Sequence, residues 1–207
     1  MQMQKEVSRQ LVHLSGIFFI LLAQVAGREV AILYFLSAAA FFLVYGEYIR
    51  RETRRLDALP TIRGKLRETT LKLERTGVRP FTGAFWFYFS CGISFLLFPF
   101  PIASAACMML AVGDAFSTLV GVRFGRHAIL KGKSLEGSIA FFLSSLAASL
   151  FFVSPFTALS GSIAATLAEV LPNMKYLIKL KGKGLLDDNF TVPIVSGVVM
   201  LLISIGL

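Results

Sequence analysis

Seven apolar stretches, each close to the length of a membrane-spanning helix, restrict what this chain can fold into. They cover residues about 11–27, 30–49, 81–99, 101–121, 137–153, 156–171 and 191–207. A spanning helix needs ~17–25 mostly apolar residues, and several stretches lie at the short end of that range. Lipid offers no partners to backbone polar groups, so helices are the expected solution. The sequence therefore predicts an all-α, polytopic integral membrane bundle of about seven transmembrane helices, with residues 1–207 as one domain.

Composition supports a membrane protein and argues against nucleic-acid binding. The chain is 56% hydrophobic and 16% charged, well outside the range of soluble domains. Its net charge of +9 comes from basic residues in the segments that flank apolar stretches. Anionic lipid headgroups and a polyphosphate substrate are the partners that this placement favours.

The basic residues also predict an orientation. With seven spans, every Lys and Arg except Arg28 falls on the side of the N-terminus. The positive-inside rule makes that side cytoplasmic. The 50–80 loop is strongly basic, and residues 64–77 within it are compatible with an interfacial amphipathic helix. The alternative for this loop is a lipid-contacting segment without a catalytic role.

Asp114 is the most unusual residue, because it lies inside an apolar run. A carboxylate at that depth costs at least ~2.5 kcal/mol, so it normally pairs with a cation or lines a polar cavity. Gly113, Ser117, Gly121 and Gly125 form a small-residue ridge beside it that allows close approach of another helix or a ligand. Asp114 is thus a candidate functional residue, with an interhelical hydrogen bond or ion pair as the structural alternative.

A glycine-rich basic segment follows this ridge. It contains Arg123, Arg126, Lys131 and Lys133, and the next apolar stretch begins near Gly137. Glycines let backbone N–H groups turn toward phosphate oxygens, and a helix N-terminus favours an anion. The segment predicts a phosphate site, with a plain positive-inside loop as the alternative.

Carboxylates also occur near the ends of the last two apolar stretches. Glu169 lies near the end of the sixth, and Asp187-Asp188-Asn189 precede the seventh. Such oxygen ligands suit Mg²⁺, but Asp or Asn before a helix is also a common N-cap. Together with Asp114, these carboxylates are candidates for a single cytoplasmic pocket.

His13 is a further candidate. It follows Glu6 and Arg9 at a spacing that puts all three on one face of the first helix. An interfacial histidine that merely snorkels or caps is the alternative.

These residues together resemble a family signature. The matching residues are Glu6, Arg9, His13 and Gly16; Gly113-Asp114-Ala115, Gly121, Gly125 and Lys133-Ser134-Leu135-Glu136-Gly137-Ser138; and Glu169, Asp187-Asp188-Asn189 and Pro193. The set resembles the CTP-dependent lipid-alcohol kinases, which include dolichol, phytol and farnesol kinases and a CTP-dependent diacylglycerol kinase. The resemblance runs from residue 6 to about 197 and fits a compact prokaryotic-type member. Gln10 departs from the pattern, which has a lysine there.

The resemblance implies transfer of the γ-phosphoryl group of CTP to the hydroxyl of a membrane prenol, such as a polyprenol or dolichol. The reaction would use Mg²⁺ at the cytoplasmic face of the cell membrane. The expected catalytic residues are Asp114, Asp188 and His13, and the expected metal ligands are Asp114, Asp187, Asp188 and Glu169. The expected nucleotide and phosphate contacts are Gly113, Gly121, Arg123, Gly125, Arg126, Lys131, Lys133, Ser134, Glu136, Gly137 and Asn189.

Two other functions remain open from the sequence. A CTP:lipid-phosphate cytidylyltransferase would use the same nucleotide and metal but attack the α-phosphorus. A transporter would use Asp114 as an ion or proton site. It would need polar residues that face each other along several spans, but the first, second, third and fifth spans contain few, and no inverted repeat is visible. An oligomer is also compatible with the sequence, since the ridge that ends at Gly125 is able to pack against a second subunit.

Overall fold

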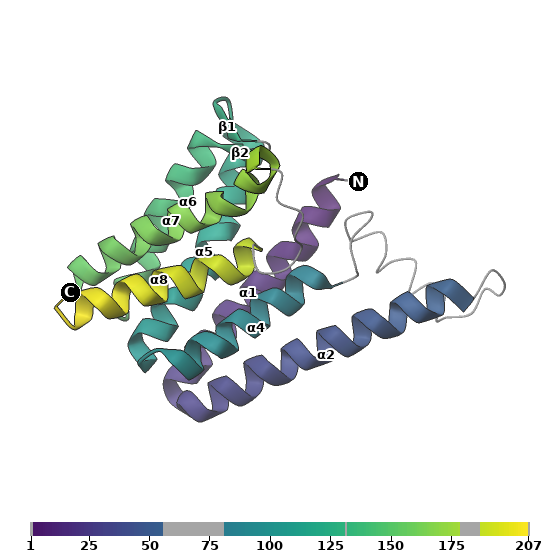
Figure 1. Cartoon of the computed structure of the whole chain (residues 1–207), viewed down its shortest axis with the longest axis horizontal. Helices are drawn as coiled ribbons and strands as arrows, with labels where there is room; N and C mark the ends of the chain where they lie inside the picture. The colour runs from purple at the N-terminus through teal and green to yellow at the C-terminus, as the bar shows by residue number, and fades with distance from the viewer. Residues whose placement is uncertain (1, 56–80, 131, 179–186, 207) are drawn as a thin grey trace.

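The computed structural model describes residues 2–55, 81–130, 132–178 and 187–206, and in these ranges the protein is almost entirely helical (Figure 1). The helices are α1 (Gln2–Ala26), α2 (Arg28–Arg55), α4 (Thr82–Leu97), α5 (Phe100–Phe124), α6 (Leu135–Ser149), α7 (Pro155–Ile178) and α8 (Asp188–Ser204). Two short strands, β1 (Ala128–Leu130) and β2 (Lys133–Ser134), lie between α5 and α6. The helix predicted within residues 64–77, and Lys131, lie outside the described residues.

Each predicted apolar stretch coincides with one of these helices, which confirms the all-α architecture. Two segments are long and apolar enough to cross a membrane by themselves, Arg28–Arg51 and Phe100–Phe124. Four shorter apolar helical segments accompany them, Ser15–Ala26, Thr82–Leu97, Leu135–Ser149 and Asp188–Ser204. The structure thus shows a helical protein with two candidate spans, whereas seven spans remain a prediction.

Local sequence signals explain where the helices begin. Pro101 occupies the first turn of α5 and Pro155 begins α7, positions at which proline loses no helical hydrogen bond. Ser134 caps α6 by accepting from the Gly137 N–H, and Asp187 caps α8 by accepting from the Asn189 N–H. Lys133, which precedes the Ser134 cap, has its Nζ 3.7 Å from Asp188 Oδ2 at the start of α8, so both helix N-termini lie near the strands.

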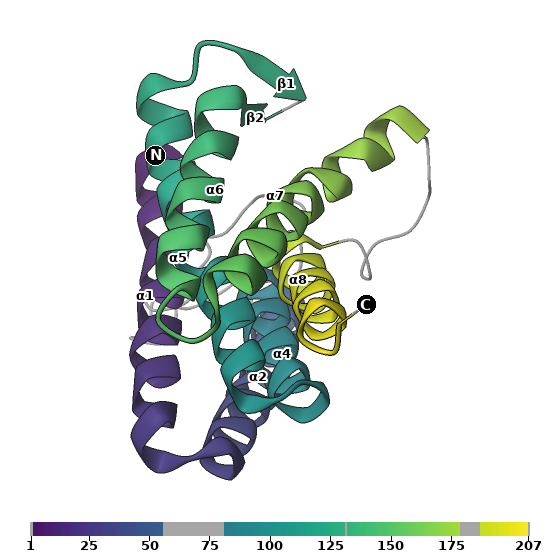
Figure 2. The same cartoon turned by 90° about the vertical axis from the view of Figure 1, so that its left-hand side faces the viewer.

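The strands form a small antiparallel hairpin in which Ala128 pairs with Ser134. Gly132 has φ +82°, a backbone conformation that side chains other than glycine rarely adopt. The hairpin turns the chain back toward the helices directly after α5 (Figure 2). As a result, Lys133 returns to the bundle instead of extending away from it.

Helix α5 is the centre of the bundle and packs against α1, α4, α6, α7 and α8. All residues from Ile102 to Ala111 are buried. α5 lies close against α6, because a Cβ on Gly113 would lie only 2.5 Å from Ser145 Oγ and 2.8 Å from the Phe141 ring. The small-residue ridge of α5 is therefore used inside the protein, against α6.

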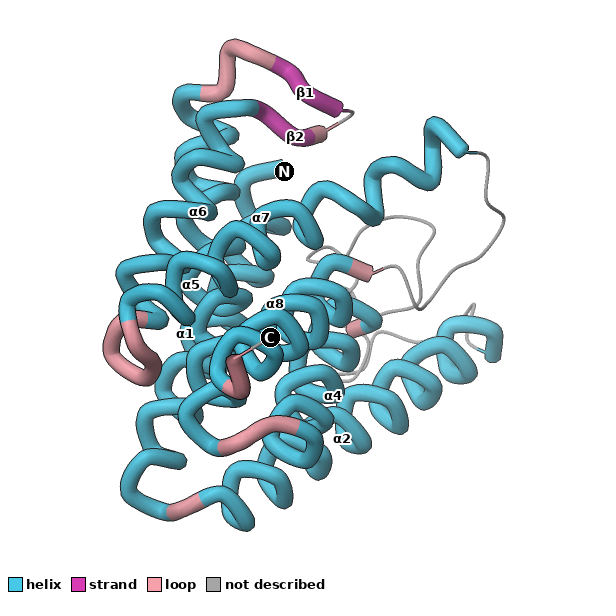
Figure 3. The backbone as a smooth tube through the Cα atoms, turned by 60° about the vertical axis from the view of Figure 1, so that its left-hand side comes forward, coloured by secondary structure: helices cyan, strands magenta, loops and turns pink. Residues whose placement is uncertain are grey.

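The two ends of the bundle differ (Figure 3). The N-terminus, the hairpin and the C-terminal end of α7 lie toward one end, and the turns from α1 to α2 and from α4 to α5 lie toward the other. At that second end Arg28 donates to the carbonyl oxygens of Phe95 (2.7 Å) and Leu96 (2.9 Å), which completes the C-terminus of α4.

Candidate functional site

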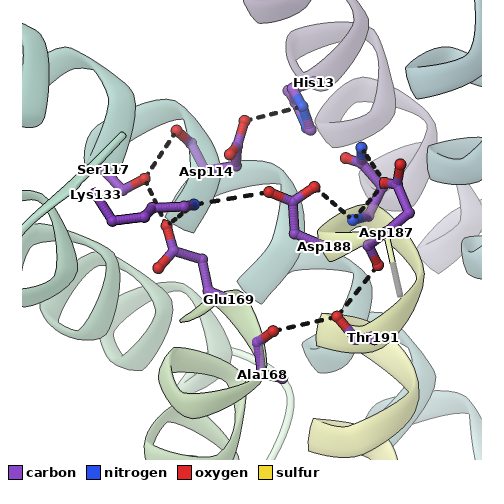
Figure 4. Close-up of polar contacts among 10 residues, drawn as sticks. His13, Asp114, Ser117, Lys133, Ala168, Glu169, Asp187, Asp188 and Thr191 are labelled. Carbon is purple, nitrogen blue, oxygen red and sulfur yellow. Dashed lines mark hydrogen bonds and ion pairs between the residues drawn. The ribbon is translucent and has the colours of Figure 1, made fainter. Parts of the chain in front are cut away.

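Polar side chains from five elements meet near the hairpin end of the bundle (Figure 4). They are His13 of α1, Asp114 of α5, Lys133 of β2, Glu169 of α7 and Asp188 of α8. His13 and Glu169 are each 1% exposed and Asp114 is 7% exposed. Charged groups are almost never buried this deeply without partners, so their contacts define the site.

His13 and Asp114 form the first contact of the site. His13 Nε2 lies 3.1 Å from Asp114 Oδ2, and the imidazole packs edge-on against Phe87 with ring centroids 4.8 Å apart. His13 Nδ1 is buried and has no hydrogen-bond partner within the described part of the chain. The pair is a buried acid–imidazole couple whose second ring nitrogen is available to another group.

Lys133 makes the second set of contacts. Its Nζ lies 2.5 Å from Glu169 Oε1 and 3.7 Å from Asp188 Oδ2. Burial acts to lower the pKa of Lys133, but the nearby charges of Asp188 and Glu169 outweigh it and hold that pKa above the ordinary value. The ammonium is therefore held in its charged form between carboxylates from two helices.

Ser117 connects the two parts of the site. One turn after Asp114, its Oγ donates to Glu169 Oε1 (3.3 Å) and, at 3.5 Å, to the Asp114 carbonyl oxygen. Glu169 Oε2 is buried and lacks a hydrogen-bond partner among the described residues. The sequence pattern alone places Ser117 in the packing ridge and does not indicate its hydrogen bond to Glu169. Its position three residues after Asp114 is the signal that it shares a face with that carboxylate.

Asp187 and Asn189 are engaged in the start of α8. Asp187 Oδ1 accepts from the Asn189 backbone N–H (3.1 Å) and side-chain Nδ2 (2.9 Å). Thr191 Oγ1 donates to Ala168 O and Asp187 O, and Ser90 Oγ donates to Asn189 O. The N-cap alternative thus accounts for Asp187, while Asp188 is the member of this trio that faces Lys133.

The structure distributes the expected phosphate contacts among several roles. Ser134 caps α6, and Gly121, Gly125 and Gly137 pack closely near it. A Cβ on Gly125 would lie 2.8 Å from Ser134 Oγ, and a Cβ on Gly137 would lie 3.0 Å from the Ser117 carbonyl oxygen. These small residues therefore shape the junction of α5, the hairpin and α6.

The remaining residues of this segment lie nearer the surface. Glu136 contacts His127 Nδ1 at 2.7 Å, and hydrogen bonds from its own backbone and from His127 lower the Glu136 pKa to about 2. Arg123 lies over the Phe124 ring at 5.6 Å, and Arg126 is exposed. Of the expected basic phosphate contacts within the described ranges, Lys133 is the one held by carboxylates of the site.

The expected metal ligands are divided between the two parts of the site. Within the described residues, no three His, Cys, Asp or Glu side chains are placed so that they could hold a metal ion together. Asp114 contacts His13, Asp187 caps α8, and Glu169 and Asp188 share Lys133. The carboxylates nearest to forming a cation site are therefore Glu169 and Asp188.

Comparison with known proteins does not assign this site. No family model matches the sequence. The chain is 26% identical over 142 residues to an uncharacterized protein of Rickettsia prowazekii, a match that covers 68% of this chain and 67% of that protein. No solved structure matches.

Proposed function

We propose that the protein is a kinase that transfers the γ-phosphoryl group of CTP to the hydroxyl of a membrane prenol, such as a polyprenol or dolichol. The observation that carries the proposal is the convergence of His13–Asp114 with Lys133, Glu169 and Asp188 at one end of an apolar helical bundle. Phosphoryl transfer depends chiefly on positioning and charge neutralisation, which these groups can supply. The choice of CTP rests on the sequence resemblance of Gly113-Asp114-Ala115 and Lys133–Ser138 to the lipid-alcohol kinases.

Under this proposal the His13–Asp114 pair binds the hydroxyl of the acceptor alcohol and removes its proton. His13 and Asp114 are hydrogen-bonded and buried, and His13 Nδ1 is available to a hydroxyl. A base within hydrogen-bond reach of an acceptor hydroxyl typically contributes 10²- to 10⁴-fold to a rate. Asp114 orients the imidazole and His13 receives the hydroxyl proton as the oxygen attacks the γ-phosphorus. The bond from the γ-phosphorus to the β–γ bridging oxygen breaks at the same time, and the electron pair leaves with CDP.

The nucleotide phosphates are assigned to the hairpin side. Lys133 supplies positive charge, Arg123 lies in the last turn of α5, and Arg126 lies on the connection between α5 and α6. The residues that fit Mg²⁺ are Glu169 and Asp188, because Mg²⁺ is commonly held by one or two carboxylates with water and phosphate oxygens completing its shell. Bound there, the ion would neutralise phosphate charge and orient the transferred group.

The apolar helices support a membrane location for the acceptor. Exposed Phe116, Leu119 and Val122 lie on α5, the helix that carries Asp114, and so offer apolar surface close to the site. The hydroxyl of a prenol would reach the site from the bilayer while the nucleotide approaches from the basic, cytoplasmic side.

The deciding experiment follows labelled phosphate. Detergent-purified protein is incubated with Mg²⁺, a mixed prenol pool and CTP labelled in the γ-phosphate, and label is counted in the lipid phase. Label in the lipid phase is expected, and repeating the assay with single alcohols and with ATP identifies the substrates. Pyrophosphate release that depends on an added lipid phosphate would instead indicate a cytidylyltransferase. No turnover in either assay, with ion flux in liposomes, would indicate the transporter.

A further inference from the structure

The Lys133 ammonium group lies between two carboxylates, where a bound metal ion would also find oxygen ligands. The nearest carboxylate oxygens are Glu169 Oε1 and Asp188 Oδ2, and the Lys133 side chain is 16% exposed. The two carboxylates come from α7 and α8, whereas the lysine comes from the short β2 strand. The acidic pair therefore receives its positive charge from an element outside the helices.

The net charge of Glu169, Asp188 and Lys133 favours a cation of higher charge than the ammonium. Two carboxylates against one ammonium leave one negative charge uncompensated when all three groups are ionised. Glu169 Oε2 is already removed from water and lacks a protein partner within the described residues. A buried oxygen without a partner is costly and favours any ligand that can satisfy it.

We propose that the Lys133 ammonium stabilises the Glu169–Asp188 pair in the metal-free protein. A divalent cation displaces this ammonium when it binds to the two carboxylates. A divalent ion brings twice the charge of the ammonium to the same hard oxygen atoms. The displaced lysine is then free to contact a phosphate group. This last step alone rests on the proposed kinase function, because the exchange of lysine for metal requires neither nucleotide nor lipid.

The exchange has a consequence for binding order. Because the lysine competes with the metal, the protein binds divalent ions weakly when no anion is present. An anion that attracts Lys133 away from the carboxylates strengthens metal binding, and by linkage the metal strengthens anion binding equally. The same lysine thus couples the two ligands.

Mn²⁺ binding to variants without nucleotide tests the exchange. Free Mn²⁺ is measured by electron paramagnetic resonance as it is titrated into detergent-purified wild type, Lys133→Gln and Arg51→Gln. Lys133→Gln retains a hydrogen-bond donor for Glu169 but not the charge. Arg51→Gln is the matched control, since it removes one charge from an exposed side chain outside the site.

Lys133→Gln is expected to bind Mn²⁺ about tenfold more tightly than wild type, because close charge pairs couple at least this strongly. Arg51→Gln should change the affinity by less than about twofold, as expected for an exposed charge. Adding Glu169→Gln to Lys133→Gln should remove the gain. Unchanged or weaker binding by Lys133→Gln would overturn the proposal.

A measurement on the wild type covers the case in which Lys133→Gln does not fold. Acetic anhydride labelling followed by mass spectrometry reports the reactivity of each lysine with and without Mg²⁺. Saturating Mg²⁺ should raise acetylation of Lys133 several-fold relative to the other lysines. Equal or lower reactivity of Lys133 with Mg²⁺ would contradict displacement. Both experiments omit CTP and prenol, so their results are independent of the kinase assay.

Discussion

At the residue scale, the burial of Asp114 needs an explanation that packing does not provide. Asp114 is 7% exposed in α5, the helix at the centre of the bundle, where an isolated carboxylate is expensive. Its contact with His13 joins the first helix to the central one. The buried polar pair costs stability that an apolar pair would not, and such costs are typical of functional sites.

Replacing either member of the His13–Asp114 pair is expected to reduce label transfer. Asp114→Asn should lower the rate by about 100-fold or more and leave the protein folded, because an amide cannot stabilise a protonated imidazole. His13→Ala should have a similar effect, and the double variant should be no worse, because the two residues act as a unit. Initial rates of label transfer measure the loss of activity, and circular dichroism measures whether each variant is folded.

The second histidine of the chain provides the control for this prediction. His127 is exposed and contacts Glu136 at the surface. His127→Ala should keep the wild-type rate within about threefold, as expected for a surface substitution. Near-normal turnover by Asp114→Asn would remove the assignment of the pair as the acceptor-side base.

Lys133 leads to a pH-dependent prediction. Its pKa in the folded protein is raised above 10.5, so its stabilising contribution is complete below pH 10.5 and is lost as pH rises through the folded pKa. Lys133→Met should lower Tm by several degrees at pH 7–9, since breaking a buried ion pair costs on the order of 3 kcal/mol. The difference from wild type should shrink only above about pH 10.5. A difference that closes below pH 9 would contradict the raised pKa.

At the element scale, the connection from α5 to α6 determines the geometry of the site. Gly113 faces Ser145 and Phe141, and Gly137 faces the Ser117 carbonyl oxygen, so the two helices approach closely along this seam. The hairpin between them directs Lys133 inward. Small residues where α5 and α6 meet therefore help to position the site.

Gly113→Ala tests the close packing of α5 and α6. The added Cβ would meet Ser145 Oγ and the Phe141 ring at distances that real Cβ atoms do not show. Forcing the helices apart should cost about 1–3 kcal/mol, which thermal unfolding in detergent measures. Gly83→Ala is the matched control, because a Cβ at Gly83 meets only Asn189 Nδ2, at 4.0 Å, and alanine favours helix. A Gly113→Ala variant as stable as Gly83→Ala would show that the seam tolerates expansion.

At the scale of the whole molecule, the sequence predicted the helical architecture because apolar length and turn residues are local signals. The helices begin near Pro101, Pro155 and Asp187, as proline and cap preferences indicate. The hairpin was not predicted, since strands of two or three residues leave no detectable periodicity.

The site was predicted less completely than the fold. The sequence identified Asp114, Glu169 and Asp188 as unusual carboxylates, and their proximity depends on helix packing that no local pattern encodes. The pairing of Asp114 with His13 and the place of Lys133 between Glu169 and Asp188 are tertiary contacts of this kind. Ser117 was assigned to packing alone because small residues serve both packing and hydrogen bonding.

The number of membrane crossings is the prediction that belongs to the whole molecule. If α2, α4 and α5 all cross, the turn before α2 and the connection after α5 lie on opposite sides. If only the two long segments Arg28–Arg51 and Phe100–Phe124 cross, they lie on the same side. Glu29→Cys places a thiol at an exposed position in the first turn of α2, and Arg126→Cys places one at an exposed position of the connection after α5.

Labelling with a membrane-impermeant maleimide distinguishes the two topologies. The native Cys91 and Cys107 are free but fully buried, so they provide a silent background. The seven-span topology predicts that Glu29→Cys reacts in intact spheroplasts and that Arg126→Cys reacts only in inside-out vesicles, because basic connections stay cytoplasmic. Reaction of both thiols from the same side would mean that the chain crosses the bilayer an even number of times between them. With α2 and α5 as the crossing helices, α4 would then pack in the bundle without crossing the bilayer.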